Sequence, residues 1–105
     1  MLEVSARVTG KEEGAYPEPL TIDPEYLGLV PRPSRAEYRA LEADILAWGG
    51  AHTPILVNRE RVILDGHTRY MICSEHGLGY SVKVLELPSR YEEMMFVIGS
   101  NLRRR

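Results

Sequence analysis

The chain has little of what several common protein classes require. It contains a single cysteine, Cys73, which excludes an internal disulfide and a zinc site built from several cysteines. No apolar run approaches the ~20 residues that cross a bilayer, and residues 1–4 lack the basic and apolar regions of a signal peptide. His52 and His76 have no paired ligand spacing, so we expect no zinc. These absences predict a cytoplasmic protein without a membrane contact.

Positive charge is also scarce. Thirteen basic and fifteen acidic side chains give a formal net charge of −2, so no global positive field would hold a nucleic-acid backbone. Arginines gather around Arg32, Arg35 and Arg39, a pattern typical of a solvated face, and again at residues 103–105. With 105 residues, 44% of them hydrophobic, the remaining composition is that of one globular domain.

Helices are the best-marked elements. Ser34 to Glu37 is a capping box, and the apolar positions after it recur at helical spacing until Gly49. The pattern predicts an amphipathic helix over residues 34–48, with Tyr38 and Trp48 as core anchors. Two further helices are expected at 68–76, closed by Gly77, and at 90–100, where Ser89 to Glu92 forms a second capping box.

Strand signals lie between the helices. Pro54 to Asn58 and Arg61 to Leu64 flank a polar turn and predict a β-hairpin, and Ser81 to Leu87 predicts a third strand with Val82 and Val84 on one face. Residues 1–33 are rich in proline and irregular; we expect one short strand early, another near Leu20 to Ile22, and partial disorder in the first twenty residues. The predicted fold class is a compact α+β domain, in which a small mixed or antiparallel sheet packs with three helices.

The most informative stretch is Val62 to Tyr70, where an apolar strand enters a polar turn and then a helix. The strand residues predict burial on both faces, and Asp65-Gly66 is a turn signal. Backbone N–H groups at the start of the following helix would lack partners and would attract an anion. Gly66 would let a phosphate approach, while Thr68 would add a hydroxyl and Arg69 a positive charge. The alternative is a plain strand-to-helix turn in which Asp65 caps the helix.

Several motifs together resemble a known family. They are the capped helix with Gly49-Gly50, then Thr53 to Val57, then Ile63 to Tyr70, and finally Asn101 to Arg104. Their order and spacing are similar to those of the ParB N-terminal domain, in the ParB/sulfiredoxin superfamily. The resemblance covers about residues 20–105 and leaves 1–19 as an irregular N-terminal segment. It implies an α+β fold of that type, cut from a longer protein.

The resemblance implies a nucleotide ligand. ParB proteins bind CTP with Mg²⁺, and their phosphate-binding Gly-Glu-Arg-Arg turn aligns with residues 66–69. It therefore implies that a nucleoside triphosphate, CTP or ATP, contacts Gly66, His67, Thr68 and Arg69, although only the glycine and the last arginine match. The Glu-Asn pair near Mg²⁺ aligns with Ser100-Asn101, so Asn101 would lie near the metal without the glutamate, and the metal would be held less firmly.

The same resemblance implies a DNA-associated role. ParB proteins clamp DNA in chromosome or plasmid segregation, and the Asp-Gly-His-x-Arg form here is closest to ParB-like domains of phages, plasmids and DNA-modification operons. A DNA-binding helix-turn-helix follows this region in ParB proteins. We therefore expect DNA contact mainly through regions beyond Arg105 or through partner chains, and a homodimer is conceivable.

Enzyme chemistry is the main alternative. Sulfiredoxins place a catalytic cysteine where this chain has His67, so that activity is not expected. A phosphotransferase of the free-serine-kinase type, or a ParB-like nuclease, would use His67 or Asp65 as acid or base, and Glu37 is another candidate carboxylate. The spacing selects neither carboxylate. A third possibility is a protein-interaction domain that keeps the fold and has lost its ligand.

Overall fold

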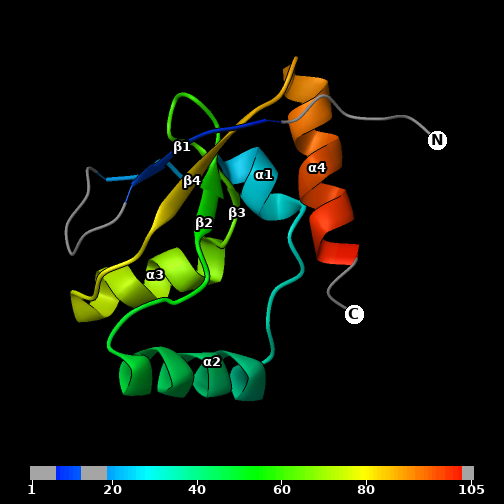
Figure 1. Ribbon diagram of the computed structural model, residues 1–105. Coiled ribbons are helices and arrows are strands. Elements are labelled where there is room, and N and C mark those ends of the chain that lie inside the picture. Colours follow the sequence, from blue (N-terminus) through cyan, green and yellow to red (C-terminus); the bar gives the residue numbers. More distant parts are fainter. Residues whose placement is uncertain (1–6, 13–18, 103–105) are drawn as a thin grey trace.

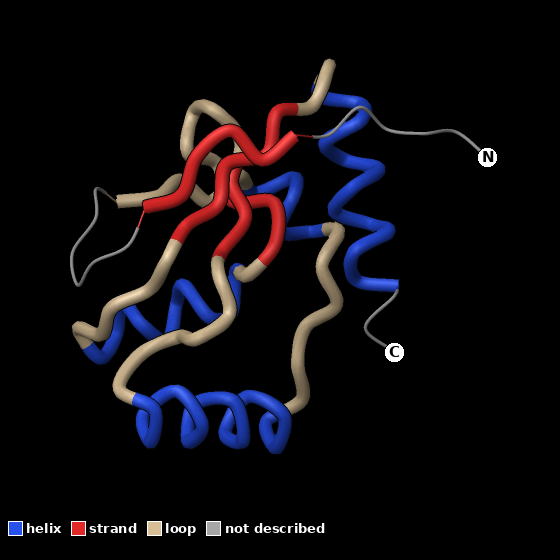
Figure 2. The backbone as a smooth tube through the Cα atoms, viewed as in Figure 1, coloured by secondary structure: helices blue, strands red, loops and turns tan. Residues whose placement is uncertain are grey.

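The computed structural model describes residues 7–12, as backbone, and residues 19–102. Four strands form one sheet in the order β1-β4-β2-β3, with helices on both sides (Figures 1 and 2). The elements in chain order are β1 Arg7–Glu12, α1 Pro24–Gly28, α2 Arg35–Trp48, β2 Ile55–Val57, β3 Ile63–Asp65, α3 His67–His76, β4 Val82–Glu86 and α4 Arg90–Leu102. The predicted α+β class is confirmed.

The sheet is mixed. β2 pairs with β3 in the predicted antiparallel hairpin and with β4 in parallel, and β1 pairs antiparallel with the other edge of β4. In the hairpin turn, the Arg61 N–H donates to the Asn58 carbonyl at 3.0 Å. The expected early strand is β1, whereas the expected strand near residue 21 is a single bridge between Thr21 and Val62. The hairpin delivers β3 to the sheet edge, from which the chain enters α3.

Side chains that alternate along the strands build one core on each face. Ile55, Val57 and Ile63 join a cluster with Ile45 of α2 and Ile72 of α3. The neighbouring Leu64 points the other way, into a cluster with buried residues of α1, β4 and α4: Tyr26, Leu85 and Val97. Val82 and Val84 share the first face, as predicted. β3 is thus buried on both sides, because successive side chains of a strand point to opposite faces.

The three predicted helices are present. Both hydrogen bonds of the Ser34 capping box form, and Gly49 ends α2 with φ +86°. The second box is only half formed, because the Ser89 hydroxyl rather than its backbone N–H contacts the Glu92 carboxylate, while the Glu92 N–H donates to Ser89 Oγ at 3.3 Å.

The predicted role of Trp48 is wrong. Its side chain is 69% exposed and lies against the His52 ring, with 4.9 Å between centroids. α2 lies beyond α3 rather than against the sheet (Figure 1), so only a narrow stripe of the helix is buried. Ile45 is the fully buried residue of α2, while Tyr38 is half-buried and packs at the edge of the core.

The structure adds a helix that the sequence analysis did not expect. α1 begins at Pro24, and the Asp23 side chain accepts from the Glu25 and Tyr26 N–H groups. Tyr26 is fully buried, and its hydroxyl donates to Glu93 of α4 at 2.6 Å. Five residues are too few to show helical periodicity, which is why composition indicated an irregular segment.

Some expectations lie outside the described residues. The predicted disorder concerns mostly residues 1–6 and 13–18, and the arginine run is at 103–105. Within the described ranges, no helix combines the length and the apolar character needed to cross a membrane.

Candidate functional site

A pocket of about 450 Å³ lies where β3 enters α3, and we call it the turn pocket. Its wall contains every residue that the sequence analysis singled out as a site residue: Asp65, Gly66, His67, Thr68, Arg69 and Asn101. The segment Val30–Pro33, together with Glu37 and Leu41, completes it. The tertiary structure therefore brings Asn101 of α4 to the turn, although it lies 32 positions after Arg69 in the sequence.

The turn has the features of an anion site. Gly66 is the N-cap of α3 with φ +106°, in the left-handed region that favours glycine. No side chain caps the helix, so the alternative in which Asp65 is the cap is wrong. The first N–H groups of α3, at His67 and Thr68, have no intrahelical acceptor. A helix start of this kind presents donors and a partial positive charge to an anion.

Arg69 is buried beneath this turn. Its side chain is 9% exposed, and Nη2 donates to the Pro54 carbonyl at 3.0 Å and lies 4.0 Å from the Asp65 carboxylate. The guanidinium therefore joins the loop before β2 to the end of β3. It also places a fixed positive charge at the wall of the turn pocket.

His67 is the least expected feature of the site. The residue is only 2% exposed, and neither nitrogen of its imidazole ring has a hydrogen-bond partner. Burial lowers the pKa of His67 below its ordinary value, and the nearby Asp65 carboxylate opposes this shift only in part. The imidazole is therefore neutral at neutral pH, with one donor and one acceptor nitrogen. Buried polar atoms without partners are uncommon in folded proteins.

Oxygen donors line the same pocket. The Asn101 side-chain nitrogen donates to the Val97 carbonyl at 2.7 Å, which leaves the carboxamide oxygen for a ligand. Asp65 adds a carboxylate, while one Glu37 oxygen accepts from the Ser34 N–H in the α2 capping box. Carboxylate and carboxamide oxygens suit Mg²⁺, so the residues present fit that ion when phosphate oxygens complete its coordination.

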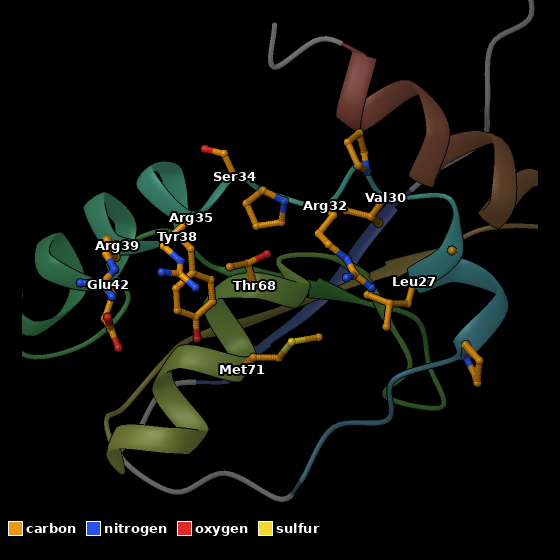
Figure 3. A pocket seen from close by; sticks show the side chains of 14 residues that line it. Leu27, Val30, Arg32, Ser34, Arg35, Tyr38, Arg39, Glu42, Thr68 and Met71 are labelled. Carbon is orange, nitrogen blue, oxygen red and sulfur yellow. The ribbon is translucent and has the colours of Figure 1, made fainter.

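A second and larger cavity, of about 1090 Å³, lies next to the turn pocket, and we call it the arginine groove (Figure 3). The two share Val30–Pro33 and Thr68. Sequence reasoning missed the groove because one side comes from α1 and the segment after it, which composition marked as irregular.

One cluster bears on the zinc expectation. Potential ligand atoms of Glu42, Glu75 and His76 lie within 4.8 Å of one another near the surface. His76 Nε2 and a Glu42 carboxylate oxygen are 2.8 Å apart, at hydrogen-bond distance, which accounts for their proximity without a metal.

Comparison with known proteins identifies the fold. No family model matches the chain, and the search of curated proteins gave no significant match. Among solved structures, one of a pNOB8-like ParB N-domain aligns with 100% of this chain at 24% identity and a TM-score of 0.75. The fold is that of a ParB N-terminal domain. A second structure, the C2221 form of a Pnob8-like ParB-N domain, aligns with 88% of the chain at 24% identity and a TM-score of 0.66.

The comparison confirms the type of fold that the resemblance implied. The chain spans 38% and 34% of the lengths of these two solved chains. Within this fold, the Asp65 to Arg69 turn forms the amino end of α3 and the centre of the turn pocket.

Proposed function

We propose that this chain is a ParB-like regulatory domain that binds a nucleoside triphosphate, CTP or another, in the turn pocket. One observation carries the proposal. Six residues singled out from the sequence, five from one turn and one from α4, line a single pocket at an uncapped helix start. A volume of about 450 Å³ lies within the usual range for small-molecule sites.

The phosphates would lie against the Gly66 to Arg69 turn. Gly66 holds the left-handed backbone conformation that begins α3, and the His67 and Thr68 N–H groups would donate to phosphate oxygens. The fixed guanidinium of Arg69 adds charge from below, and Arg32 also lines the pocket. Several donors of this kind, held in place before binding, reduce the entropy lost when the ligand binds.

His67 supports a ligand for a separate reason. Leaving a buried donor or acceptor without a partner costs about 1–3 kcal/mol. Because both ring nitrogens are buried, the turn would open slightly as the ligand binds, and a phosphate, sugar hydroxyl or base that then hydrogen-bonds to the neutral imidazole would remove this penalty. Binding would then be coupled to relief of an unfavourable feature of the free protein.

Mg²⁺ would be held by the phosphates together with Asn101 and Asp65. When bound, the ion would supply charge neutralisation between neighbouring phosphate oxygens. Asn101 would orient its carboxamide oxygen toward the pocket because its nitrogen is engaged by Val97.

The domain would act within a larger DNA-associated protein, in which nucleotide binding regulates dimerisation or DNA engagement. Support comes from the ParB N-domain fold and from the share of the solved chains that it spans, 34–38%. The net charge of −2 supports DNA contact through other regions or partner chains.

Calorimetry tests the proposal. The wild-type chain would be titrated with CTP, ATP and ADP, with and without Mg²⁺, and we expect saturable binding of at least one triphosphate that Mg²⁺ strengthens. Thr68→Ala should weaken binding, and Lys83→Ala on β4, outside the turn pocket, is the control. No heat of binding at millimolar nucleotide would reject the proposal and favour an interaction domain that has lost its ligand.

A phosphotransferase is the second candidate, favoured by the neutral His67 and the Asp65 carboxylate in one pocket. A neutral imidazole is the form that accepts a proton from an attacking hydroxyl. Phosphate release, or phosphorylation of free serine, that disappears in a His67→Gln variant while nucleotide still binds would establish this activity.

A further inference from the structure

The arginine groove is lined by two helices, the start of a third, and the segment that joins α1 to α2. Figure 3 shows Arg35, Tyr38 and Arg39 of α2 on one side, Met71 of α3 below and Leu27 of α1 opposite. Arg35 and Arg39 are cationic. The other lining side chains are mainly apolar, and Val30, Pro31 and Pro33 are also in the wall. The groove thus combines an apolar floor with a positive rim.

The arginines of this rim are exposed and have no acidic partner. Within residues 19–102, Arg32, Arg35 and Arg39 form no ion pair or hydrogen bond. Arginines elsewhere in that range do form ion pairs: Arg59 with Glu86 at 2.9 Å, and Arg90 with Asp23 at 3.1 Å. Unpaired positive charge is therefore concentrated at the groove.

Arg35 and Arg39 are at positions where a positive charge does not stabilise helix α2. Arg35 and Arg39 are four residues apart, where like charges repel by a few tenths of a kcal/mol. Arg35 is also the first residue of the helix, where a positive charge opposes the helix dipole. An anionic partner would relieve both effects, whereas the folded domain alone gives no reason for them.

The floor favours a peptide over a nucleic-acid backbone. Leu27 is 36% exposed, a partly accessible apolar surface beside the half-buried Met71. A phosphate backbone would gain little from this floor. It would also meet the Glu42 carboxylate at one end of the groove, whereas a peptide can alternate charged and apolar side chains. A volume of about 1090 Å³ suits several side chains rather than one small molecule.

We propose that the arginine groove docks an acidic peptide segment of a partner protein, with an apolar anchor against Leu27 and Met71 and carboxylates against Arg35 and Arg39. In this type of recognition a peptide lies in a groove of the folded domain. Apolar anchor residues provide most of the affinity, and the charged residues fix the position of the peptide along the groove. The proposal does not depend on nucleotide binding. Leu27, Arg35, Arg39 and Met71 line the groove and not the turn pocket.

The first experiment asks which peptides the groove selects. Random peptides displayed on phage would be panned against the wild-type chain, and the enriched sequences compared with the input library. We expect enrichment of aspartate and glutamate around one or two large apolar residues. Synthetic, fluorescein-labelled forms of the enriched peptides then serve as probes in fluorescence anisotropy, at low and high salt, with a duplex DNA oligonucleotide measured in parallel.

Matched variants locate the binding. R35A/R39A removes two positive charges at the groove, and A40E/A47E makes the same change in net charge at exposed positions of α2 outside it. We expect the first variant to weaken the peptides by about tenfold, as two lost surface ion pairs would, and the second by less than about threefold. Leu27→Ser should weaken them without unfolding the domain, because that side chain is already partly exposed. Far-UV circular dichroism checks folding.

Four outcomes would overturn the proposal. Enrichment of peptides without acidic residues would do so, and so would peptides that bind R35A/R39A as tightly as wild type. DNA binding that R35A/R39A abolishes, with no peptide preference, would assign the rim to nucleic acid. Concentration-dependent dimerisation by sedimentation that R35A/R39A abolishes, again with no peptide preference, would assign the groove to a second copy of this chain.

Discussion

The guanidinium of Arg69 lies beneath Gly66, with Nη2 3.0 Å from the position that a β-carbon at residue 66 would occupy. The same nitrogen donates to the Pro54 carbonyl at 3.0 Å, so the guanidinium cannot move away from residue 66 without losing that hydrogen bond. The turn, the buried cation and the loop before β2 are therefore one packed unit. This unit forms the base of the turn pocket.

Gly66→Ala should destabilise the domain by about 1–3 kcal/mol, because residue 66 has φ +106° and an added methyl would also press on Ile55 Cγ1 at 3.2 Å. Gly99→Ala in α4 is the matched control. Position 99 has open space around it, so alanine there should stabilise the helix by about 0.5–1 kcal/mol. Urea unfolding measures both, and equal effects of the same sign would contradict the argument.

Replacing Arg69 by alanine should cost roughly 2–4 kcal/mol of stability, because the Asp65 carboxylate, whose side chain is 12% exposed, would lose its cation. Nucleotide affinity should fall as well. The control is Arg59→Ala, which breaks an ion pair in which the arginine side chain is 70% exposed and should cost no more than about 1 kcal/mol. Thermal and urea unfolding would show whether the buried and exposed arginines differ as expected.

Because of His67, the free energy of unfolding should depend on pH at pH values below 6.5, which is the ordinary pKa of a histidine side chain. Burial lowers the pKa in the folded protein, so the unfolded chain binds a proton first as the pH falls. The contribution of neutral His67 to stability is complete above about pH 6.5 and is lost progressively below it, toward the lower pKa of the folded state. His67→Gln should reduce this acid sensitivity.

An NMR titration of the His67 ring protons tests the same point directly. The midpoint in the folded protein should lie below 6.5, and a midpoint at or above that value would show that the imidazole is not desolvated. A bound nucleotide whose phosphate hydrogen-bonds to the ring should raise the midpoint, which separates binding in the turn pocket from binding elsewhere.

Two substitutions on α2 test which of its apolar residues packs in the core. Ile45→Ala removes a side chain that is 1% exposed and should cost about 2–4 kcal/mol. Trp48→Ala removes one that is 69% exposed and should change stability by no more than about 0.5 kcal/mol. If the tryptophan substitution proved the more damaging, the placement of α2 over α3 would be wrong.

Local signals predicted the helices and the turn well. The Ser34 capping box and the glycines at 49 and 77 act within a few residues of the chain, so their effects can be read without knowing the fold. The β-hairpin is equally local. The same holds for the glycine turn at residue 66, where the need for a left-handed backbone is a property of one residue.

Side-chain burial could be predicted only in part. The strand residues Ile63 and Leu64 are buried as expected. Trp48 has the helical spacing of a core residue, yet that spacing cannot reveal that α2 faces a single helix. α1 escaped prediction because its stability comes from packing Tyr26 against α4, a contact between residues far apart in sequence.

The sequence by itself determined where the chain turns and caps its helices, and which residues around Gly66 have the chemistry to hold an anion. These are properties of short segments, set by backbone sterics and hydrogen bonding. Only the tertiary structure decided that Asn101 and Arg32 meet that turn, that both nitrogens of His67 are buried without partners, and that Arg35 and Arg39 face an apolar groove. Packing between distant segments sets these features, because burial and electrostatics depend on what the rest of the fold places around each side chain.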